Sequence, residues 1–433
     1  MKTIFLSGKR WMRTREPVSV LISSAEACNG VTIVKFKAGD TEYVVPVEKC
    51  SCPSKHTMEI DGEVFCEAEY CPDFLQRLSS CSSIKLRKHA SVQALRLEGV
   101  LAEDATNPHL IVSAESGEKF VLKGYRLSSR WNPEPAFLEH LSNTGISPGL
   151  ILSYSLDEQV LGILTEYIEG GTDPGSILYE SMVSTLQGDY RVPESELGGV
   201  AATIAAFHNR MLECKEDWCR PRYAERTDID RWLGRTAFYR LKLEKLGWNI
   251  GKAWAYLSQP VEEGFSRSLG QRILRTHGDL HFSQMLMKSN NFYILDFEGE
   301  PGRPAEFQRD LEPAIRDVAT MLRGLSYIVF FAIANTLKLS QEEAFNYVLS
   351  GDSRVRLASD WAQEVSDVLL EAYLRRINRE IVPASSPEEA YRLVLPWFVE
   401  RALYEAYYEA SYRADNIYAA LATLYKTIPP LNL

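Results

Sequence analysis

The sequence is short of positive charge and of long apolar runs. It has 48 Lys and Arg residues against 58 Asp and Glu residues, which gives a formal net charge of −10. Proteins that bind nucleic acids along the phosphate backbone need a basic face, so this shortage argues against that class. The longest apolar stretch, LSYIVFFAIANTL at 325–337, is far below the roughly 20 residues that a membrane-spanning helix needs. We therefore expect neither a nucleic acid nor a membrane as a partner.

The N-terminus also lacks a long apolar run. MKTIFLSGKRWMRTREPVSV contains only three apolar residues in a row before polar residues and charge return, which is too short for a secretory signal peptide. With 45% apolar, 24% charged and 11% aromatic residues, the composition is that of an ordinary globular protein. A chain of 433 residues is too long for a single core, so two or three subdomains are expected. These features favour a cytoplasmic protein, which we expect to be a monomer or a homodimer.

Cysteine is scarce after the first 81 residues. Only Cys214 and Cys219 lie beyond that point, and the other six lie within it. The N-terminal group has a C-x-C and a C-x₄-C spacing, which differ from the C-x₂-C of zinc knuckles. Buried thiols or disulfides are therefore favoured over a zinc site, and disulfides in a cytosolic protein would suggest a hyperthermophilic source. The six are Cys28, Cys50, Cys52, Cys66, Cys71 and Cys81.

Hydrophobic patterning divides the chain into two β-rich parts and one helical part. Short runs rich in branched residues, such as VTIVKFKA and EYVVPV, are typical of strands and recur through residues 1–90. Five more strand-like runs with one inserted helix, AFLEHLSNTG, occupy 91–168. After that, apolar residues recur at i, i+3, i+4 and i+7, which indicates amphipathic helices. We predict an α+β fold with an N-terminal β-rich cap (1–90), a β-rich N-lobe (91–168) and a mainly helical C-lobe (169–433).

One stretch interrupts the helical part with loop and strand signals, RTHGDLHFSQMLMKSNNFYILDFEGEP at 275–301. It carries Asp279 in a polar turn, Gln284 five residues later, and Asp296 directly after the apolar run YIL. Phosphoryl transfer needs a base near an acceptor hydroxyl and metal ions that neutralise the phosphates. The order of these residues matches the HRDxxxxN and DFG motifs of protein kinases. Asp279 is thus the candidate base, and Gln284 and Asp296 are candidate Mg²⁺ ligands, since hard oxygens suit that ion.

Each of these residues also has a purely structural interpretation. Asp279 could cap a helix, and Asp296 could form a turn at the end of a strand. His277 and His281, which flank Asp279, are expected to be structural, with His277 bracing the loop. Chance alone is a poor explanation for all of these residues in this order, so the hypothesis of a catalytic site is favoured.

The block HGDLHFSQ…LDFEGEP…RP…IRDVATMLR resembles the maltokinase and glucosamine kinase group of the aminoglycoside-phosphotransferase-like kinases. That group carries HGDLH-x-x-Q, where its relatives have Asn, followed by DFEGEP and RDVA-x-M-L-R. Three other parts of that group also have counterparts here. Its strand lysine and following helix resemble FVLKGYR and NPEP, its hinge resembles TEYIEGG, and its closing helix resembles ERALYEAYYEASYRAD. The resemblance implies a bilobal protein-kinase-like fold that binds ATP and Mg²⁺ and phosphorylates a sugar.

The resemblance also implies a nucleotide site in the N-lobe. Lys123 in FVLKGY would pair with the α and β phosphates, and either Glu134 or Glu139 of the next helix would hold the lysine. The turn DATN at 104–107 resembles the phosphate loop of the family, although it has no G-x-G-x-x-G pattern. The remaining implied contacts are those of Thr106 and Asn107 with the γ-phosphate, and of the backbone of Glu166, Tyr167 and Ile168 with adenine.

On the acceptor side, the resemblance implies contacts from three segments. RDVA puts Arg316 and Asp317 at the start of a helix, where Asp317 would orient the sugar or the loop, or would only favour the helix N-terminus. Near the C-terminus, Tyr and Glu at i, i+4 steps offer stacking surfaces and acceptors for sugar hydroxyls or a sugar amine. A partly buried aromatic face with solvated glutamates is the alternative. Glu298 and Glu300, which flank a Gly just after Asp296, would bind the acceptor or hold the following loop. The other candidates are Glu405, Tyr408 and Glu409, of which Glu409 is the best single choice.

Two departures from the family leave the sugar open. YRADN at 412–416 stands where the family has nRPdW, and RWMRTR at 10–15 stands where it has RWFGGK. We expect an ATP- and Mg²⁺-dependent kinase of a maltose-type disaccharide or of a hexose such as glucosamine or glucose. The alternatives are phosphorylation of an aminoglycoside or amino-alcohol, and an inactive binding module with this fold. An inactive module would have lost Asp279, Gln284 or Asp296, and all three are present.

Overall fold

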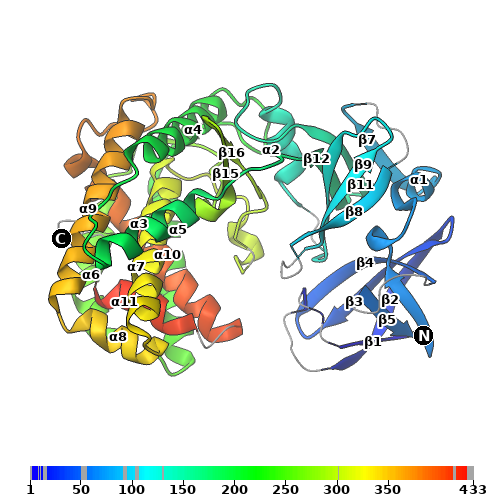
Figure 1. Ribbon diagram of the computed structural model, residues 1–433, viewed down its shortest axis with the longest axis horizontal. Coiled ribbons are helices and arrows are strands. Elements are labelled where there is room, and N and C mark those ends of the chain that lie inside the picture. The colour runs from blue at the N-terminus through cyan, green and yellow to red at the C-terminus, as the bar shows by residue number, and fades with distance from the viewer. Residues whose placement is uncertain are drawn as a thin grey trace. The chain divides into compact units, whose positions relative to one another are not determined.

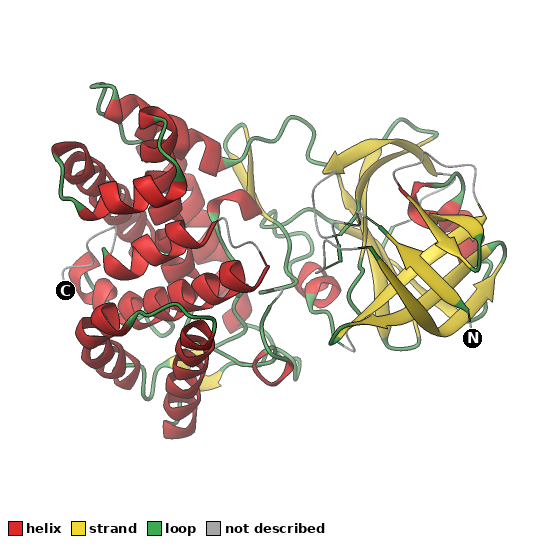
Figure 2. Ribbon diagram, turned by 90° about the horizontal axis from the view of Figure 1, so that it is seen from below, coloured by secondary structure: helices red, strands yellow, loops and turns green. Residues whose placement is uncertain are grey.

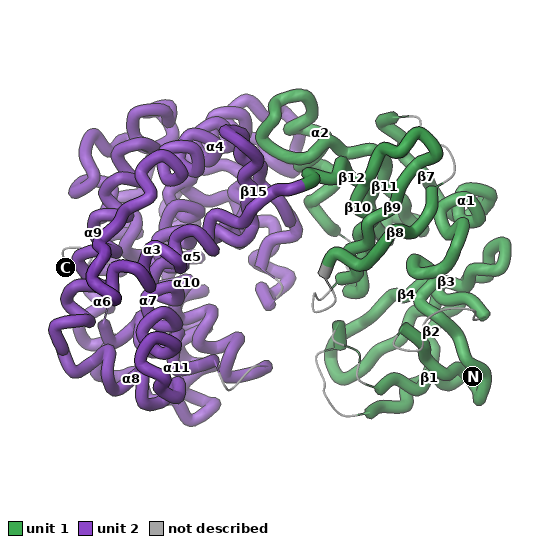
Figure 3. Tube along the Cα trace, in the orientation of Figure 1, with its two compact units in different colours: residues 1–169 green, residues 170–433 purple. Residues whose placement is uncertain are grey.

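The computed structural model describes residues 2–7, 9, 11–12, 17–49, 56–90, 95–102, 107–128, 131–300, 302–412 and 416–426. The chain divides into two compact units, Met1–Glu169 and Gly170–Leu433 (Figure 3). Strands dominate the first unit and helices dominate the second (Figure 2). The predicted α+β class is therefore confirmed.

The first unit begins with a closed antiparallel barrel (Figure 1). Two of its hairpins turn on Asn29-Gly30 and Asp61-Gly62, whose φ angles are all positive (43° and 85°, 50° and 80°). Such angles define the two-residue turns that match the twist of antiparallel strands. Alternate side chains of the strands point inward and form an apolar core. In pairing order the strands are β1 (Thr3–Leu6), β2 (Val18–Cys28), β3 (Val31–Ala38), β4 (Thr41–Lys49), β6 (Glu63–Glu67) and β5 (Thr57–Ile60).

A second antiparallel sheet completes the first unit. It contains the five strands predicted for 91–168 and one more at its edge, β7 (Ile84–Lys88), which falls in the predicted cap. One apolar cluster draws side chains from the barrel, from α1 (Phe74–Ser79) and from this sheet, so residues 1–90 share a core with the N-lobe. In pairing order the strands are β7, β11 (Leu150–Leu156), β12 (Gln159–Glu166), β10 (Lys119–Gly124), β9 (His109–Ala114) and β8 (Leu95–Ala102); η2 (Ala68–Tyr70) precedes α1, and α2 (Glu134–His140) follows β10.

The second unit is built of helices with two short strand pairs. The pairs are β13 (Arg222–Tyr223) with β14 (Arg272–Ile273), and β15 (Met285–Lys288) with β16 (Asn291–Ile294). The short helices η3 (Phe282–Gln284) and η4 (Ala305–Phe307) lie in the loops between the longer ones. The longer helices are α3 (Pro174–Leu186), α4 (Glu194–Leu212), α5 (Arg226–Lys245), α6 (Gly251–Ser266), α7 (Ile315–Leu337), α8 (Gln341–Leu349), α9 (Ser353–Leu374), α10 (Pro387–Tyr412) and α11 (Ile417–Tyr425).

Helix α7 is the central apolar element of the second unit. It is long and apolar enough to resemble a membrane span by length and composition, but 78% of its apolar window is buried inside the structure. It packs against α3, α10 and α11. A helix that is apolar on most sides is buried either in lipid or in a protein core, and the contacts of α7 are those of a core helix.

The described cysteines form disulfides. Cys28 pairs with Cys81 in the first unit, and Cys214 pairs with Cys219 between α4 and α5, with Cα–Cα separations of 5.7 and 5.9 Å. Cys66 and Cys71 are also disulfide-bonded, whereas Cys50 and Cys52 lie outside the described residues. Among the three alternatives left open by the sequence, the structure therefore favours disulfides over free thiols or a zinc site.

Four buried charged side chains link the barrel to the second sheet. Glu67, at the end of β6, accepts bonds from Lys9 Nζ at 2.8 Å and Arg126 Nη2 at 2.7 Å. Arg126 also binds Glu69 at 2.7 Å. Burial by itself would raise the pKa of Glu67, but the charges of Arg126 and Lys9 outweigh it and lower the pKa to about 2. For Glu69, burial outweighs the attraction of Arg126, and its pKa is raised.

The two described disulfides should contribute unequally to stability. In the chain-entropy treatment, closing the 53-residue separation of Cys28 and Cys81 stabilises the fold by about 4 kcal/mol, and closing the separation of 5 for Cys214 and Cys219 stabilises it by about 2 kcal/mol. We expect the double variant Cys28→Ser/Cys81→Ser to lose more unfolding free energy in urea than Cys214→Ser/Cys219→Ser. The reverse order would contradict this assignment.

The buried charges of the first unit predict a particular pH dependence. Because the pKa of Glu67 is lowered from 4.5 to about 2, its ion pairs stabilise the folded state above about pH 4.5 and lose that contribution as the pH falls toward 2. We expect the difference in unfolding free energy between the wild type and Glu67→Gln to be largest at neutral pH and to become smaller in acid. Urea titrations over a pH series measure this difference. Glu63→Gln is the control, because the Glu63–Lys49 pair is exposed and should show almost no gap.

Candidate active site

Asp317 anchors the loop that carries Asp279. Its two carboxylate oxygens accept bonds from the backbone N–H groups of His277 at 2.8 Å and Gly278 at 2.9 Å. His208 Nε2 lies 3.1 Å from the same carboxylate. Burial opposes ionisation of Asp317, but the bond with His208 and the nearby charges and N–H groups outweigh burial and lower its pKa. The carboxylate therefore stays ionised and fixes the backbone immediately before Asp279.

Arg316 and Glu300 hold the same loop from another side. Arg316 Nη1 donates to the Gly278 carbonyl at 2.8 Å, and its Nη2 binds Glu300 Oε1 at 2.8 Å. Arg316, Asp317 and Glu300 have exposed fractions of only 1%, 0% and 5%. Asp317 binds the backbone of the loop, and Glu300 holds Arg316, which also binds the loop. Asp317 thus orients the loop, which was one of the roles expected for it. The contacts of Arg316, Asp317 and Glu300 with the acceptor stay predictions.

The candidate metal ligands lie side by side in the second unit. Gln284 ends η3 and Asp296 follows β16, and the Gln284 amide donates to Asp296 Oδ2 at 2.9 Å. Asp296 has a φ of +60°, a left-handed conformation that side chains other than glycine adopt mainly at turns and functional sites. An amide oxygen and a carboxylate are the hard donors that Mg²⁺ prefers. The residues present therefore fit the ion.

His277 links the loop of Asp279 to the segment that carries Asp296. Its Nε2 lies 2.8 Å from the carbonyl oxygen of Leu295, directly before Asp296. This contact agrees with the structural role expected for His277. His281 lies just before η3, and its pKa is lowered because burial disfavours the charged ring more than Asp279 favours it. The base candidate and the metal candidates thus sit on two segments that are bonded to each other.

In the first unit, Lys123 of β10 forms a buried ion pair with Glu134 of α2. The Nζ–Oε2 distance is 2.7 Å, and Tyr125 donates to the same oxygen at 2.6 Å. Glu139 pairs instead with Arg87 at 2.9 Å and lies 3.2 Å from His89. Of the two carboxylates that the sequence left open, the structure brings Glu134 to Lys123, and the assignment of Glu139 is corrected.

The remaining nucleotide-side residues are mostly engaged in local structure. The side chain of Asn107 accepts a bond from the Arg126 backbone at 3.1 Å, and Thr106 lies outside the described residues. The backbone N–H of Glu166 donates to Gly149 at 2.9 Å, and that of Tyr167 reaches Lys119 at 3.4 Å. The Asn107 side-chain oxygen and these two N–H groups are thus engaged in local structure. The contacts of Asn107 with the γ-phosphate and of the Glu166 and Tyr167 backbone with adenine stay predictions. Ile168, which ends the predicted hinge, makes no such bond within the described residues and stays a candidate.

Helix α10 presents the predicted acceptor-side residues together with Arg401, which the sequence did not suggest. Glu405 binds Arg401, one turn earlier, at 2.5 Å, and it forms an ion pair with a second such residue, Arg323 of α7. Arg323 lies over the Tyr327 ring, 3.6 Å from its centroid. Burial lowers the pKa of Arg323 to about 10. Two arginines thus pair with Glu405, and its contact with the sugar stays a prediction.

Glu409, Tyr408 and Glu298 keep their candidate status. Glu409 is 8% exposed on α10, and Tyr408 is half-buried with its ring 6.0 Å from that of Tyr404. Glu298 is half-buried, two residues after Asp296. The i, i+4 spacing of Arg401 and Glu405 is a typical helical ion pair, and this signal in the sequence could have identified Arg401.

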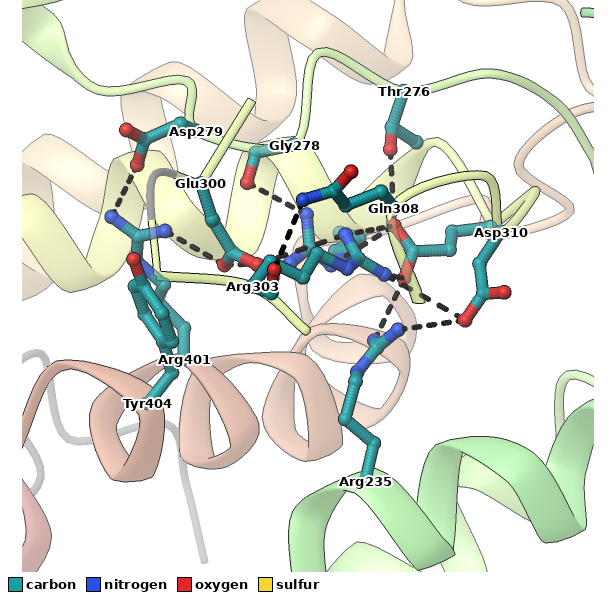
Figure 4. Close-up of polar contacts among 12 residues, drawn as sticks. Arg235, Thr276, Gly278, Asp279, Glu300, Arg303, Gln308, Asp310, Arg401 and Tyr404 are labelled. Atoms are coloured by element: carbon teal, nitrogen blue, oxygen red, sulfur yellow. Dashed lines mark hydrogen bonds and ion pairs between the residues drawn. The ribbon is translucent and has the colours of Figure 1, made fainter. Parts of the chain in front are cut away.

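Arg401 connects α10 to the base candidate. Its Nη2 binds Asp279 Oδ1 at 2.5 Å and its Nη1 binds Glu300 Oε1 at 2.8 Å (Figure 4). The pKa of Arg401 is raised, because the carboxylates of Asp279 and Glu300 outweigh its burial. Asp279 is thus held in place by a side chain that the motif does not contain.

No protein-family model matches the chain. Its sequence is 25% identical over 258 residues to a glucosamine kinase of Mycolicibacterium smegmatis, which covers 56% of this chain and 62% of that protein. It is 31% identical over 77 residues to a glucosamine kinase of Streptacidiphilus jiangxiensis, 18% of each chain. The chain therefore matches less than two thirds of the length of these curated relatives.

Solved structures show the same fold over most of the chain. A glucosamine kinase (crystal form A) superposes with a TM-score of 0.61 at 18% identity, covering 96% of this chain and 92% of that one. A glucosamine kinase in complex with glucosamine, ADP and inorganic phosphate gives a TM-score of 0.61 at 17% identity, covering 96% of both chains. At these identities the comparison shows that the chain shares the fold of the glucosamine kinases. These relatives are glucosamine kinases and do not test the maltokinase part of the resemblance.

Removing the charge of Asp317 should loosen the loop of Asp279. Asparagine keeps one acceptor oxygen, so Asp317→Asn leaves one of two buried N–H groups without its bond, at a cost of about 1–3 kcal/mol in unfolding free energy. If the loop shifts as a result, kcat should fall by roughly tenfold or more. Thermal denaturation and initial rates measure the two effects. Asp228→Asn is the control, because Asp228 is buried against Arg222 at 2.6 Å away from these loops. Its stability should fall, and its kcat should stay unchanged.

Proposed function

We propose that the chain is an ATP- and Mg²⁺-dependent phosphotransferase that uses a sugar hydroxyl as acceptor. The observation that carries this proposal is that the metal candidates and the base candidate lie on bonded segments. Gln284 donates to Asp296. Leu295, directly before Asp296, is in turn bonded to His277 in the loop of Asp279. Phosphoryl transfer depends on positioning and electrostatic stabilisation more than on covalent chemistry. Two linked loops that offer a base and two hard-oxygen ligands supply that arrangement.

Each residue has a distinct role in the proposed reaction. Asp279 accepts the proton of the acceptor hydroxyl as the oxygen attacks the γ-phosphorus. The bond between that phosphorus and the oxygen bridging the β and γ phosphates breaks, and ADP leaves. Gln284 and Asp296 would hold Mg²⁺, which neutralises charge on the donor phosphates when bound. Lys123, held by Glu134 at 2.7 Å, binds the α and β phosphates in the manner of the strand lysine of kinases. Its buried carboxylate partner holds the ammonium in a fixed orientation.

A hexose such as glucosamine is the first acceptor to test, and a maltose-type disaccharide is the second. The two sequence relatives are glucosamine kinases, which supports the hexose. Arg401 and Arg323 neutralise Glu405, so α10 carries less free negative charge than its sequence suggests. This pairing weighs against a polycationic aminoglycoside, for which unpaired carboxylates are favourable. Glu409 and Tyr408 are the proposed sugar contacts.

Replacing the base should abolish transfer without abolishing nucleotide binding. We expect Asp279→Asn to lower kcat by roughly 10²- to 10⁴-fold, because general-base assistance contributes on that scale. The affinity for ATP·Mg²⁺ should stay near the wild-type value, and thermal shift with ATP·Mg²⁺ measures it. ADP release over a panel of glucosamine, glucose, maltose and an aminoglycoside identifies the acceptor.

The outcomes of this panel separate the alternatives. Equal activity of Asp279→Asn would contradict the assignment of the base. A wild type that gains stability with ATP·Mg²⁺ but phosphorylates no acceptor would point to a binding module. If ATP·Mg²⁺ does not stabilise the wild type, the proposed nucleotide site is wrong.

A further inference from the structure

One arginine joins the base candidate to two other carboxylates of the second unit. The guanidinium of Arg401 donates through Nη2 to Asp279 at 2.5 Å, through Nη1 to Glu300 at 2.8 Å, and through Nε to Glu405 at 2.5 Å. Its plane lies over the Tyr404 ring, 4.9 Å from the centroid. Arg401 is 6% exposed, so these bonds are shielded from water and are stronger than exposed ion pairs. Every nitrogen of the side chain is committed.

Glu300 closes a ring of contacts around the loop of Asp279. Its Oε1 binds Arg401 and Arg316, both at 2.8 Å. Arg316 donates in turn to the carbonyl of Gly278, directly before Asp279. Glu300 therefore helps to fix two parts of the loop. It holds the backbone through Arg316 and the side chain of the base through Arg401 (Figure 4). Glu300 follows Asp296 by four residues, so the ring also ties the base to the segment of the metal candidates.

We infer that Arg401 is a positioning residue for Asp279, with Glu300 as the carboxylate that holds Arg401 in place. The inference rests on the proposed function, since it assigns Arg401 a role in the reaction of that site. Arg401 fixes Oδ1 of Asp279 and thereby directs Oδ2 toward the acceptor hydroxyl. Arg401 does not touch the reacting atoms, so its effect is on the geometry of the base.

The contacts of Arg401 require an arginine. A guanidinium presents its donors in a rigid planar fork, whereas the ammonium of lysine is a point charge on a flexible stem. Arg401→Lys keeps the charge and can reach one or two of the three carboxylates. Arg401→Gln removes the charge and most of the bonds. The two variants therefore separate orientation from electrostatic attraction.

A matched control is available in the same unit. Arg235 is also fully buried and also binds three carboxylates, Glu400 at 2.8 Å, Glu312 at 2.7 Å and Asp310 at 3.2 Å, but its contacts do not include Asp279. Arg235→Lys should lower the melting temperature as much as Arg401→Lys does. It should leave kcat at the wild-type value, because Asp279 keeps its partner.

The test measures kcat, KM for ATP, nucleotide affinity and melting temperature on the full chain. We expect Arg401→Gln to lower kcat by roughly 10- to 100-fold, since small displacements of a catalytic group have effects of that size. KM for ATP and the affinity for ADP·Mg²⁺ should stay within about twofold of the wild type. Arg401→Lys should recover part of the lost kcat. A kcat of Arg401→Gln within about threefold of wild type, or a loss matched by Arg235→Lys, would overturn the inference.

A crystal structure of Arg401→Gln gives a readout that does not depend on activity. The carboxylate of Asp279 should leave its wild-type orientation while the backbone bonds from Asp317 to His277 and Gly278 persist. An unmoved carboxylate would overturn the inference even if the enzyme is active. If the wild type transfers phosphate to no acceptor, the proposed function fails, and the crystal structure still decides whether Arg401 positions Asp279.

Discussion

Charge pairing in a buried interior is the interaction on which the candidate site depends. Glu300 alone binds Arg316 at 2.8 Å and Arg401 at 2.8 Å, and it lies 3.7 Å from Arg303. Burying each ion costs several kcal/mol, which only well-aligned bonds between opposite charges offset. Burial would raise the pKa of Glu300, but the three arginines outweigh it and lower the pKa. The fork of each arginine gives these pairs a defined geometry, and so it fixes the loops attached to them.

This interior explains how two irregular segments keep an arrangement suited to chemistry. Asp296 has a φ of +60°, a conformation that in a residue other than glycine persists only when surrounding contacts determine it. Gly278 has a φ of +88°, which glycine adopts readily. Asp317 and Arg316 bind the backbone of Gly278, and Glu300 holds Arg316. Catalytic groups gain most from such preorganisation, because no reorganisation is then needed when charge develops. The carboxylates that lie beside the motif thus support the loop that carries the base candidate.

Much of the fold could be predicted because it depends on local patterns. Branched residues in alternation identified β8 to β12, and the 3.6-residue period identified the helices of the second unit. The order of Asp279, Gln284 and Asp296 predicted that these side chains would gather on neighbouring loops, and the Gln284–Asp296 bond agrees with that expectation. The edge strand β7 and the core shared between barrel and sheet depend on contacts between distant segments, which a local pattern does not contain.

The sequence by itself determined the succession of strands and helices and the kinds of side chain that carry the proposed chemistry, because periodicity and motif order are local properties of the chain. Only the tertiary structure decided which partner each charged group takes. Glu134 and Glu139 both lie on α2, yet the rotation of that helix brings one to Lys123 and the other to Arg87. Arg401 meets Asp279 although 122 positions separate them. Such pairings are set by the packing of whole helices, because a buried charge is tolerated only where that packing supplies its counterion.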